Sequence, residues 1–181
     1  AREVINAIPR KRLFTQIEPD GKQPHELRRT LAFGYSQFNL SHFIDIFMMA
    51  RKIGISIDNA TSEDGRSFYK AMDFLVPYVG KDVKAWPYQQ ISEWKYKQQE
   101  FCKDLYRTFL LNPERKDYLK LYKTHRIIDW KDRFNLLWME ADDVDNAYAF
   151  ACGQLQFAMQ CAAKARKEAD NQCKHRVIPR S

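Results

Sequence analysis

The sequence predicts an all-α protein, and three observations support this fold class. Among the 181 residues, 45% are hydrophobic but only 6 are glycine, and the chain is rich in Lys, Glu, Gln, Leu and Ala, which favour helix. Apolar residues recur at helical spacing in several segments, and no segment shows the alternation of a convincing strand. Helical hairpins in succession are typical of an α/α solenoid or toroid, so we predict an α/α toroid-type fold and an incomplete toroid.

The first half of the chain contains one long predicted helix. Residues 2–16 resemble the end of an amphipathic helix that is interrupted at Pro9. A turn follows at Pro19-Asp20-Gly21, and Pro24 predicts extended backbone after it. The clearest helix covers residues 36–53 and is apolar on more than one stripe, so we expect it to be deeply buried, with Gly54 as its C-cap.

The second half predicts further helices separated by short breaks. A loop over residues 55–66 precedes a helix over 67–79, and an extended aromatic segment at 86–91 precedes a helix over 93–111. Asn112-Pro113 ends that helix, and Pro113 then suits the first turn of a short helix through Tyr122. The sequence leaves 129–142 ambiguous and predicts a last helix over 143–171. We predict one domain over 1–173 and a basic tail over 174–181.

The charge of the chain favours an anionic partner. The formal net charge is +7, which suits nucleic acid, an anionic membrane or an acidic polysaccharide, although it also fits a merely soluble basic surface. The Lys and Arg residues are spread along the chain without a nucleic-acid-binding motif, so we expect no nucleic acid as partner. No apolar run reaches the ~18 residues that a membrane span needs, so we expect no membrane partner either.

The cysteines and histidines show no spacing typical of a metal site, so the sequence implies no cofactor. Cys152 and Cys161 lie on one predicted helix about 13 Å apart, too far for a direct disulfide. A bridge between Cys161 and Cys173, or from Cys102 to either, remains open beside the alternative of buried free thiols.

A polar, turn-rich stretch from Gln16 to Ser36 leads into the long predicted helix and holds the candidate chemistry. It places Arg29 and Tyr35 at a helix entrance, where free backbone N–H groups and the positive end of the helix dipole suit an anion. His25 lies in the loop and could contact a substrate. His42 lies on the long helix, and we expect it to be a core histidine with its hydrogen bonds satisfied.

This stretch resembles the segment Q-x-x-x-D-G-x-Q-P-x-E-L-x-R-T-x-x-x-x-Y-S of the alginate lyase family. The resemblance covers roughly residues 10–91 and continues through Asp64-Gly65-Arg66-Ser67, Ala71-Met72-Asp73-Phe74-Leu75 and Trp86-Pro87-Tyr88-Gln89-Gln90-Ile91. It implies the C-terminal portion of an α/α toroid whose cleft binds alginate or a related polyuronate and cleaves it by β-elimination. It also implies a secreted or periplasmic protein.

The resemblance implies a role for each candidate residue. Arg29 would neutralise the uronate carboxylate. Arg28 would take this role if the alignment of the chain with the family segment is shifted by one residue. Tyr35 would be the catalytic acid, helped by a nearby cation, and in one form of the implied mechanism it would also be the base. The implied substrate-binding residues are Arg28, His25, Gln23, Trp86, Tyr88 and Gln89.

Each of these roles has a structural alternative. Tyr35 could be a packing residue, the arginines could be surface charges, and the Trp86 segment could be an aromatic core plug rather than a sugar-binding platform. The family's Asn-His pair does not occur before Tyr35, so we expect a missing N-terminal half or a partner chain to supply it. The competing hypotheses are a non-catalytic module that binds acidic polysaccharide and, more remotely, a basic helical nucleic-acid binder.

Overall fold

The computed structural model describes residues 2–127 and residue 133 of the chain. The chain divides into two compact units, Ala1–Ile127 and Ile128–Ser181, and the description below concerns the first. The predictions for 129–142, for the helix over 143–171, for the tail over 174–181 and for the three cysteines after Cys102 lie outside the described residues. The single domain over 1–173 therefore stays a prediction.

The described residues form helices joined by turns and loops, which confirms the predicted all-α class for this part of the chain. Within it, β-type pairing is limited to two isolated bridges, Leu31 with Gln90 and Thr61 with Ser67. The elements in order are α1 (Arg2–Asn6), η1 (Pro9–Leu13), α2 (Phe14–Gln16), α3 (Pro24–Leu27), α4 (Ala32–Lys52), α5 (Phe68–Leu75), η2 (Val76–Tyr78), η3 (Val83–Ala85), α6 (Trp94–Leu111) and α7 (Lys116–His125).

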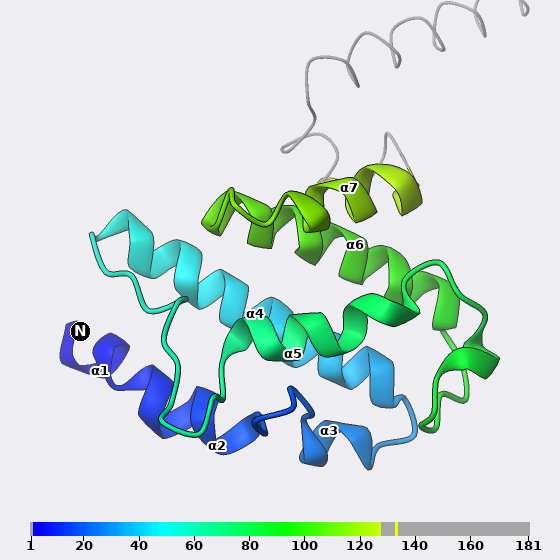
Figure 1. The fold of residues 1–181 in the computed structure, drawn as a ribbon, viewed down its shortest axis with the longest axis horizontal. Coiled ribbons are helices and arrows are strands. Elements are labelled where there is room, and N and C mark those ends of the chain that lie inside the picture. Colours follow the sequence, from blue (N-terminus) through cyan, green and yellow to red (C-terminus); the bar gives the residue numbers. More distant parts are fainter. Residues whose placement is uncertain (1, 128–132, 134–181) are drawn as a thin grey trace, which may run out of the picture. The chain divides into compact units, whose positions relative to one another are not determined.

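Helix α4 is the centre of this unit (Figure 1), and it packs against α3, α5 and α6. Aromatic rings connect it to its neighbours: Phe47 meets Phe68 of α5 edge to face at 5.0 Å, and Phe33 meets Phe101 of α6 at 5.8 Å. Burial of these side chains removes a large apolar area from water and stabilises the packing. The largest fully buried side chains are Tyr118, Phe33, Phe47, Phe68, Phe101, Leu13, Ile17, Leu40, Ile44, Met72, Leu75 and Leu105.

Helices α6 and α7 form a helical hairpin across a short turn (Figure 1). The rings of Tyr106 and Tyr122 stack with centroids 4.7 Å apart, and the Gln99 side chain bonds the carbonyl of His125 and the N–H of Ile127. This hairpin agrees with the predicted architecture. The prediction that Pro113 begins the second helix was wrong, because Pro113 lies in the turn and α7 begins at Lys116.

A buried polar network joins α4 to α6. The Gln37 amide donates to Asp104 at 2.6 Å, and Asp104 also pairs with Arg107 at 3.3 Å. Arg107 in turn pairs with Asp45 on α4. Burial raises the pKa of Asp104 to about 6, against the opposing effects of the Gln37 hydrogen bond and the Arg107 charge. The network therefore fixes the register of the two helices with a carboxyl group that titrates near neutral pH.

The ends of several elements differ from the predictions for identifiable reasons. The first helical stretch is interrupted near Pro9 as predicted: α1 ends at Asn6, and the backbone widens at Pro9 into the π-type turn η1. Pro24 occupies the first turn of α3 instead of extending the chain, since a helix start needs no N–H from that residue. Helix α4 begins at Ala32, earlier than predicted, and it is buried on one side only, because Phe38 and Met49 are exposed.

Candidate functional site

Tyr35 lies in the first turn of α4 and borders an open hollow, which we call the phenol hollow. The hollow has a volume of about 210 Å³ and is lined by Leu31, Gly34, Tyr35, Phe38, Glu93 and Lys97. It therefore lies between the start of α4 and the start of α6. Tyr35 is half-buried, and no hydrogen bond to its hydroxyl occurs among the described residues, so the phenol is accessible to a ligand.

The Arg29 guanidinium lies over the ring of Tyr35, with Cζ 3.8 Å from the ring centroid. A cation over an aromatic face is held by the quadrupole of the ring, so this contact orients an exposed arginine. In the described part of the chain no carboxylate pairs with Arg29. The predicted neighbourhood of a phenol and a guanidinium is therefore present, and the guanidinium keeps its hydrogen-bond donors available.

The backbone N–H groups at the start of α4 are not available to an anion. The Gln90 side-chain oxygen accepts from the N–H groups of Phe33, at 3.0 Å, and Gly34, at 3.4 Å, while the Gln89 carbonyl accepts from Ala32 at 3.0 Å. The N–H of Tyr35 bonds the Leu31 carbonyl at 2.8 Å. The prediction that this helix entrance binds an anion through free N–H groups was wrong, because the 86–91 segment caps the helix. Any anion in the hollow must be bound by side chains.

Trp86 lies inside an aromatic cluster that this same segment completes. Its side chain is 5% exposed and meets Tyr78 at 4.7 Å and Phe33 at 5.4 Å, both edge to face. The indole N–H has no hydrogen-bond partner among the described residues. Trp86 presents no face on which a sugar could stack, so its placement fits a core plug and gives no support to the predicted sugar-binding platform.

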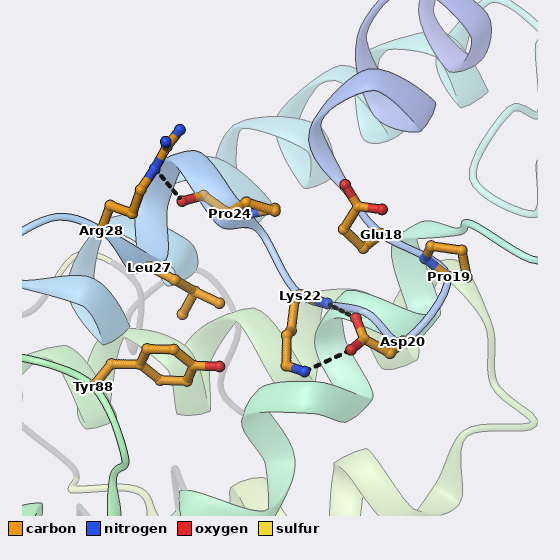
Figure 2. A pocket seen from close by; sticks show the side chains of 8 residues that line it. All are labelled: Glu18, Pro19, Asp20, Lys22, Pro24, Leu27, Arg28 and Tyr88. Carbon is orange, nitrogen blue, oxygen red and sulfur yellow. Dashed lines mark hydrogen bonds and ion pairs between the residues drawn. The ribbon is translucent and has the colours of Figure 1, made fainter.

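A second and larger hollow, which we call the turn hollow, lies beside the Pro19-Asp20-Gly21 turn (Figure 2). Its volume is about 630 Å³, and it is lined by Glu18, Pro19, Asp20, Lys22, Pro24, Leu27, Arg28 and Tyr88. Lys22 turns its ammonium toward Asp20, at 2.7 Å, and this pair lowers the pKa of Asp20 and raises the pKa of Lys22. Arg28 bonds the Pro24 carbonyl at 3.1 Å and the His25 ring at 3.0 Å. The cations of the turn hollow are thus already engaged.

The remaining predicted residues fall outside both hollows. Gln23 is 1% exposed and joins the Ser36 carbonyl to the Asn39 amide, so its placement as an internal connector does not support substrate binding. His25 is exposed beside Arg28, and the side chain of Gln89 is also exposed. His42 is exposed and packs on the Phe38 ring at 4.3 Å, so the prediction of a core histidine was wrong.

The sequence analysis named only Tyr35 among the residues that line the phenol hollow, and Phe38 and Lys97 are two that it missed. Phe38 is 54% exposed and lies one turn after Tyr35 on the same face of α4, a spacing that the helical period could have revealed. Lys97 comes from α6, and no local pattern connects it with Tyr35, because only the packing of α6 on α4 brings them together.

The described residues show neither a metal centre nor a membrane span. No three His, Cys, Asp or Glu side chains among them are grouped closely enough to hold a metal ion. None of the helices found there has the length and apolarity needed to cross a bilayer. Cys102, the cysteine in this part, is a buried free thiol, and burial raises its pKa to about 12.

The described residues thus define a helical-hairpin protein in which a phenol borders an open hollow, with two cations nearby that pair with no described carboxylate. A family model described as alginate lyase matches residues 1–86. The crystal structure of an alginate lyase from Bacteroides ovatus is 47% identical, with a TM-score of 0.74, over 77% of this chain and 37% of that one. No curated protein matches. Over residues 1–86 the chain belongs to the alginate lyase family, and it spans a little over a third of the length of the solved relative.

Proposed function

We propose that this protein is, or forms part of, a polysaccharide lyase that cleaves alginate or a related polyuronate by β-elimination at the phenol hollow. The observation that carries the proposal is the accessible Tyr35 phenol with the Arg29 guanidinium 3.8 Å from its ring centroid. Membership of the alginate lyase family supports the substrate class.

The reaction requires three steps that these groups can perform. Arg29 pairs with the C6 carboxylate of the uronate, which makes the C5 proton more acidic. The ionised Tyr35 removes that proton, the electron pair forms the C4–C5 double bond, and the bond from C4 to the glycosidic oxygen breaks. Tyr35 then donates the same proton to the leaving oxygen and is again ionised for the next cycle. The charge that develops on the sugar is stabilised by the cations at the hollow.

The partner that we propose is an acidic polysaccharide, and the corresponding location is secreted or periplasmic. Alginate is a polymer outside the cytoplasm, so a protein that degrades it works where the polymer is. The cations beside the phenol hollow pair with no carboxylate of residues 2–127, which supports an anionic ligand, because each sugar of a polyuronate carries a carboxylate.

The proposal is tested by mixing the full chain with polymannuronate and following the ultraviolet absorbance of unsaturated uronate ends. We expect a rise in absorbance that Tyr35→Phe abolishes and Tyr88→Phe preserves, because Tyr88 lies in the turn hollow. Near-normal turnover by Tyr35→Phe would remove the phenol from the mechanism. Tight retention of the wild-type chain on alginate without any unsaturated product would instead indicate a non-catalytic binding module.

A further inference from the structure

Lys97 lines the phenol hollow beside the first turn of α4. It stands in the first turn of α6, where its N–H bonds the Glu93 carbonyl at 2.9 Å. Its side chain runs along the backbone of Gly34: a Cβ at position 34 would lie 3.1 Å from Cγ and 3.3 Å from both Cδ and Cε of Lys97. The glycine therefore leaves space for the lysine stem, which lies close against the turn that carries Tyr35.

The ammonium of Lys97 has no carboxylate partner in the described part of the chain. The ammonium lies near the Tyr96 ring, with Nζ 5.1 Å from the ring centroid. Lys22 and Lys103, in contrast, each pair with a carboxylate at 2.7 Å. Glu93 lines the same hollow and forms no ion pair with any residue that the structure describes. Lys97 thus brings a half-buried, unmatched positive charge to the hollow that contains Tyr35.

We propose that Lys97 is a substrate-binding residue whose ammonium pairs with a carboxylate of the polyuronate in the phenol hollow. This inference rests on the proposed function and deepens it. Arg29 lies on the Tyr35 ring and takes the carboxylate of the reacting sugar, while Lys97 takes the carboxylate of an adjoining sugar. A contact with a sugar that does not react is made equally in the ground state and the transition state, so its loss raises KM and leaves kcat unchanged.

The test compares Lys97→Gln with Lys95→Gln in the full chain, using polymannuronate as the probe. Both variants remove one positive charge from the first turn of α6, but Lys95 is exposed and does not line the hollow. We expect Lys97→Gln to raise KM about tenfold with kcat within about twofold, and Lys95→Gln to behave as the wild type. The ratio of the KM of Lys97→Gln to the KM of Lys95→Gln is expected to decrease at high ionic strength, since salt screens the pairing of the ammonium with the carboxylate.

A third variant and a binding measurement separate the possible outcomes. Lys97→Arg keeps the positive charge and is expected to restore most of the affinity for polymannuronate. If Lys97 had only a structural role, the affinity would not depend on keeping this charge. If the wild type is retained on alginate but forms no product, a tenfold weaker retention of Lys97→Gln supports the inference although the proposed reaction fails. Equal KM values for Lys97→Gln and Lys95→Gln in an active enzyme overturn the inference and leave the proposed reaction intact.

Discussion

The turn hollow and the phenol hollow differ in how their cations are balanced. In the turn hollow, the larger of the two, Lys22 pairs with Asp20, and Arg28 is held by the Pro24 carbonyl and the His25 ring. At the smaller phenol hollow, Lys97 lines the wall and Arg29 lies over the ring of Tyr35, and neither cation has a carboxylate partner among the described residues. An anionic ligand gains more from an unmatched cation than from one that must first leave its partner. The smaller hollow is therefore the better candidate for a polyuronate site.

The largest difference between the hollows is expected from their two phenols. Tyr35→Phe removes the hydroxyl that we assign to proton transfer and is expected to lower kcat about a thousandfold, while the retained ring leaves KM similar. Tyr88→Phe makes the same chemical change in the turn hollow and is expected to change kcat less than twofold. Rates of unsaturated-end formation on polymannuronate measure both. A comparable loss in both variants would show that the hollows do not differ as we describe.

The next effect concerns stability, and it compares Trp86 in the aromatic core with Tyr88, which lies between this core and the turn hollow. Trp86→Ala opens a cavity in the cluster with Phe33 and Tyr78, so we expect a loss of about 3 kcal/mol in the free energy of unfolding. Tyr88→Ala, at the half-buried edge of that cluster, is expected to lose about 1 kcal/mol. Urea unfolding monitored by circular dichroism gives both values. Little loss for Trp86→Ala, with weaker binding to alginate, would favour the sugar-platform role instead.

Substitution of the two neighbouring arginines, one at a time, gives a matched comparison in which the expected change in activity is smaller. Arg29→Ala removes the guanidinium above Tyr35, and we expect kcat/KM to fall about thirtyfold, the value of one charge-assisted hydrogen bond. Arg28→Ala breaks contacts with Pro24 and His25 at the turn hollow and is expected to cost less than threefold. Initial rates at low substrate concentration distinguish them. If Arg28→Ala has the larger effect, the register of the family segment is off by one residue.

The smallest predicted effect is a pH dependence of the stability contributed by the polar network between α4 and α6, the two helices that border the phenol hollow. Burial raises the pKa of Asp104 to about 6, against about 3.9 in an unfolded chain. Between these values the folded protein holds a proton that the unfolded chain has lost, so this contribution to stability is full below about pH 4 and falls as pH rises through about 6. Asp104→Asn lacks this titration.

The stability of the wild type relative to Asp104→Asn is therefore expected to fall by about 2 kcal/mol from pH 4 to pH 7. Urea unfolding of both proteins across this range measures the difference. A difference that increases with pH would show that Arg107 keeps the carboxylate ionised, and that the pKa of Asp104 lies below its usual value.

The sequence predicted features that depend on local pattern. The long α6 was predicted at 93–111 and is found at Trp94–Leu111, because its apolar spacing and Asn112-Pro113 are both local signals. The end of α4 near Gly54 was predicted, although the C-cap is Ile53 and Gly54 follows it with a left-handed φ of +74°. The neighbourhood of Arg29 and Tyr35 was also predictable, because only five residues and one helix start lie between them.

Features that depend on contacts between distant segments could not be predicted in the same way. A buried aromatic plug and an exposed sugar platform can have the same residue composition. Only the packing of Trp86 against Phe33 decides between these two roles. The cap that Gln90 places on α4 and the position of Lys97 beside Gly34 both arise from segments far along the chain. A sequence pattern contains the period of a helix but not the identity of the helix that packs against it.

The central claim is that the phenol hollow, rather than the turn hollow, holds the uronate. A crystal structure of the Tyr35→Phe chain with a bound oligomannuronate tests it directly. We predict a sugar carboxylate within hydrogen-bond distance of Arg29 or Lys97, with the reacting ring against residue 35. An oligosaccharide in the turn hollow against Tyr88, with the phenol hollow empty, would contradict the claim.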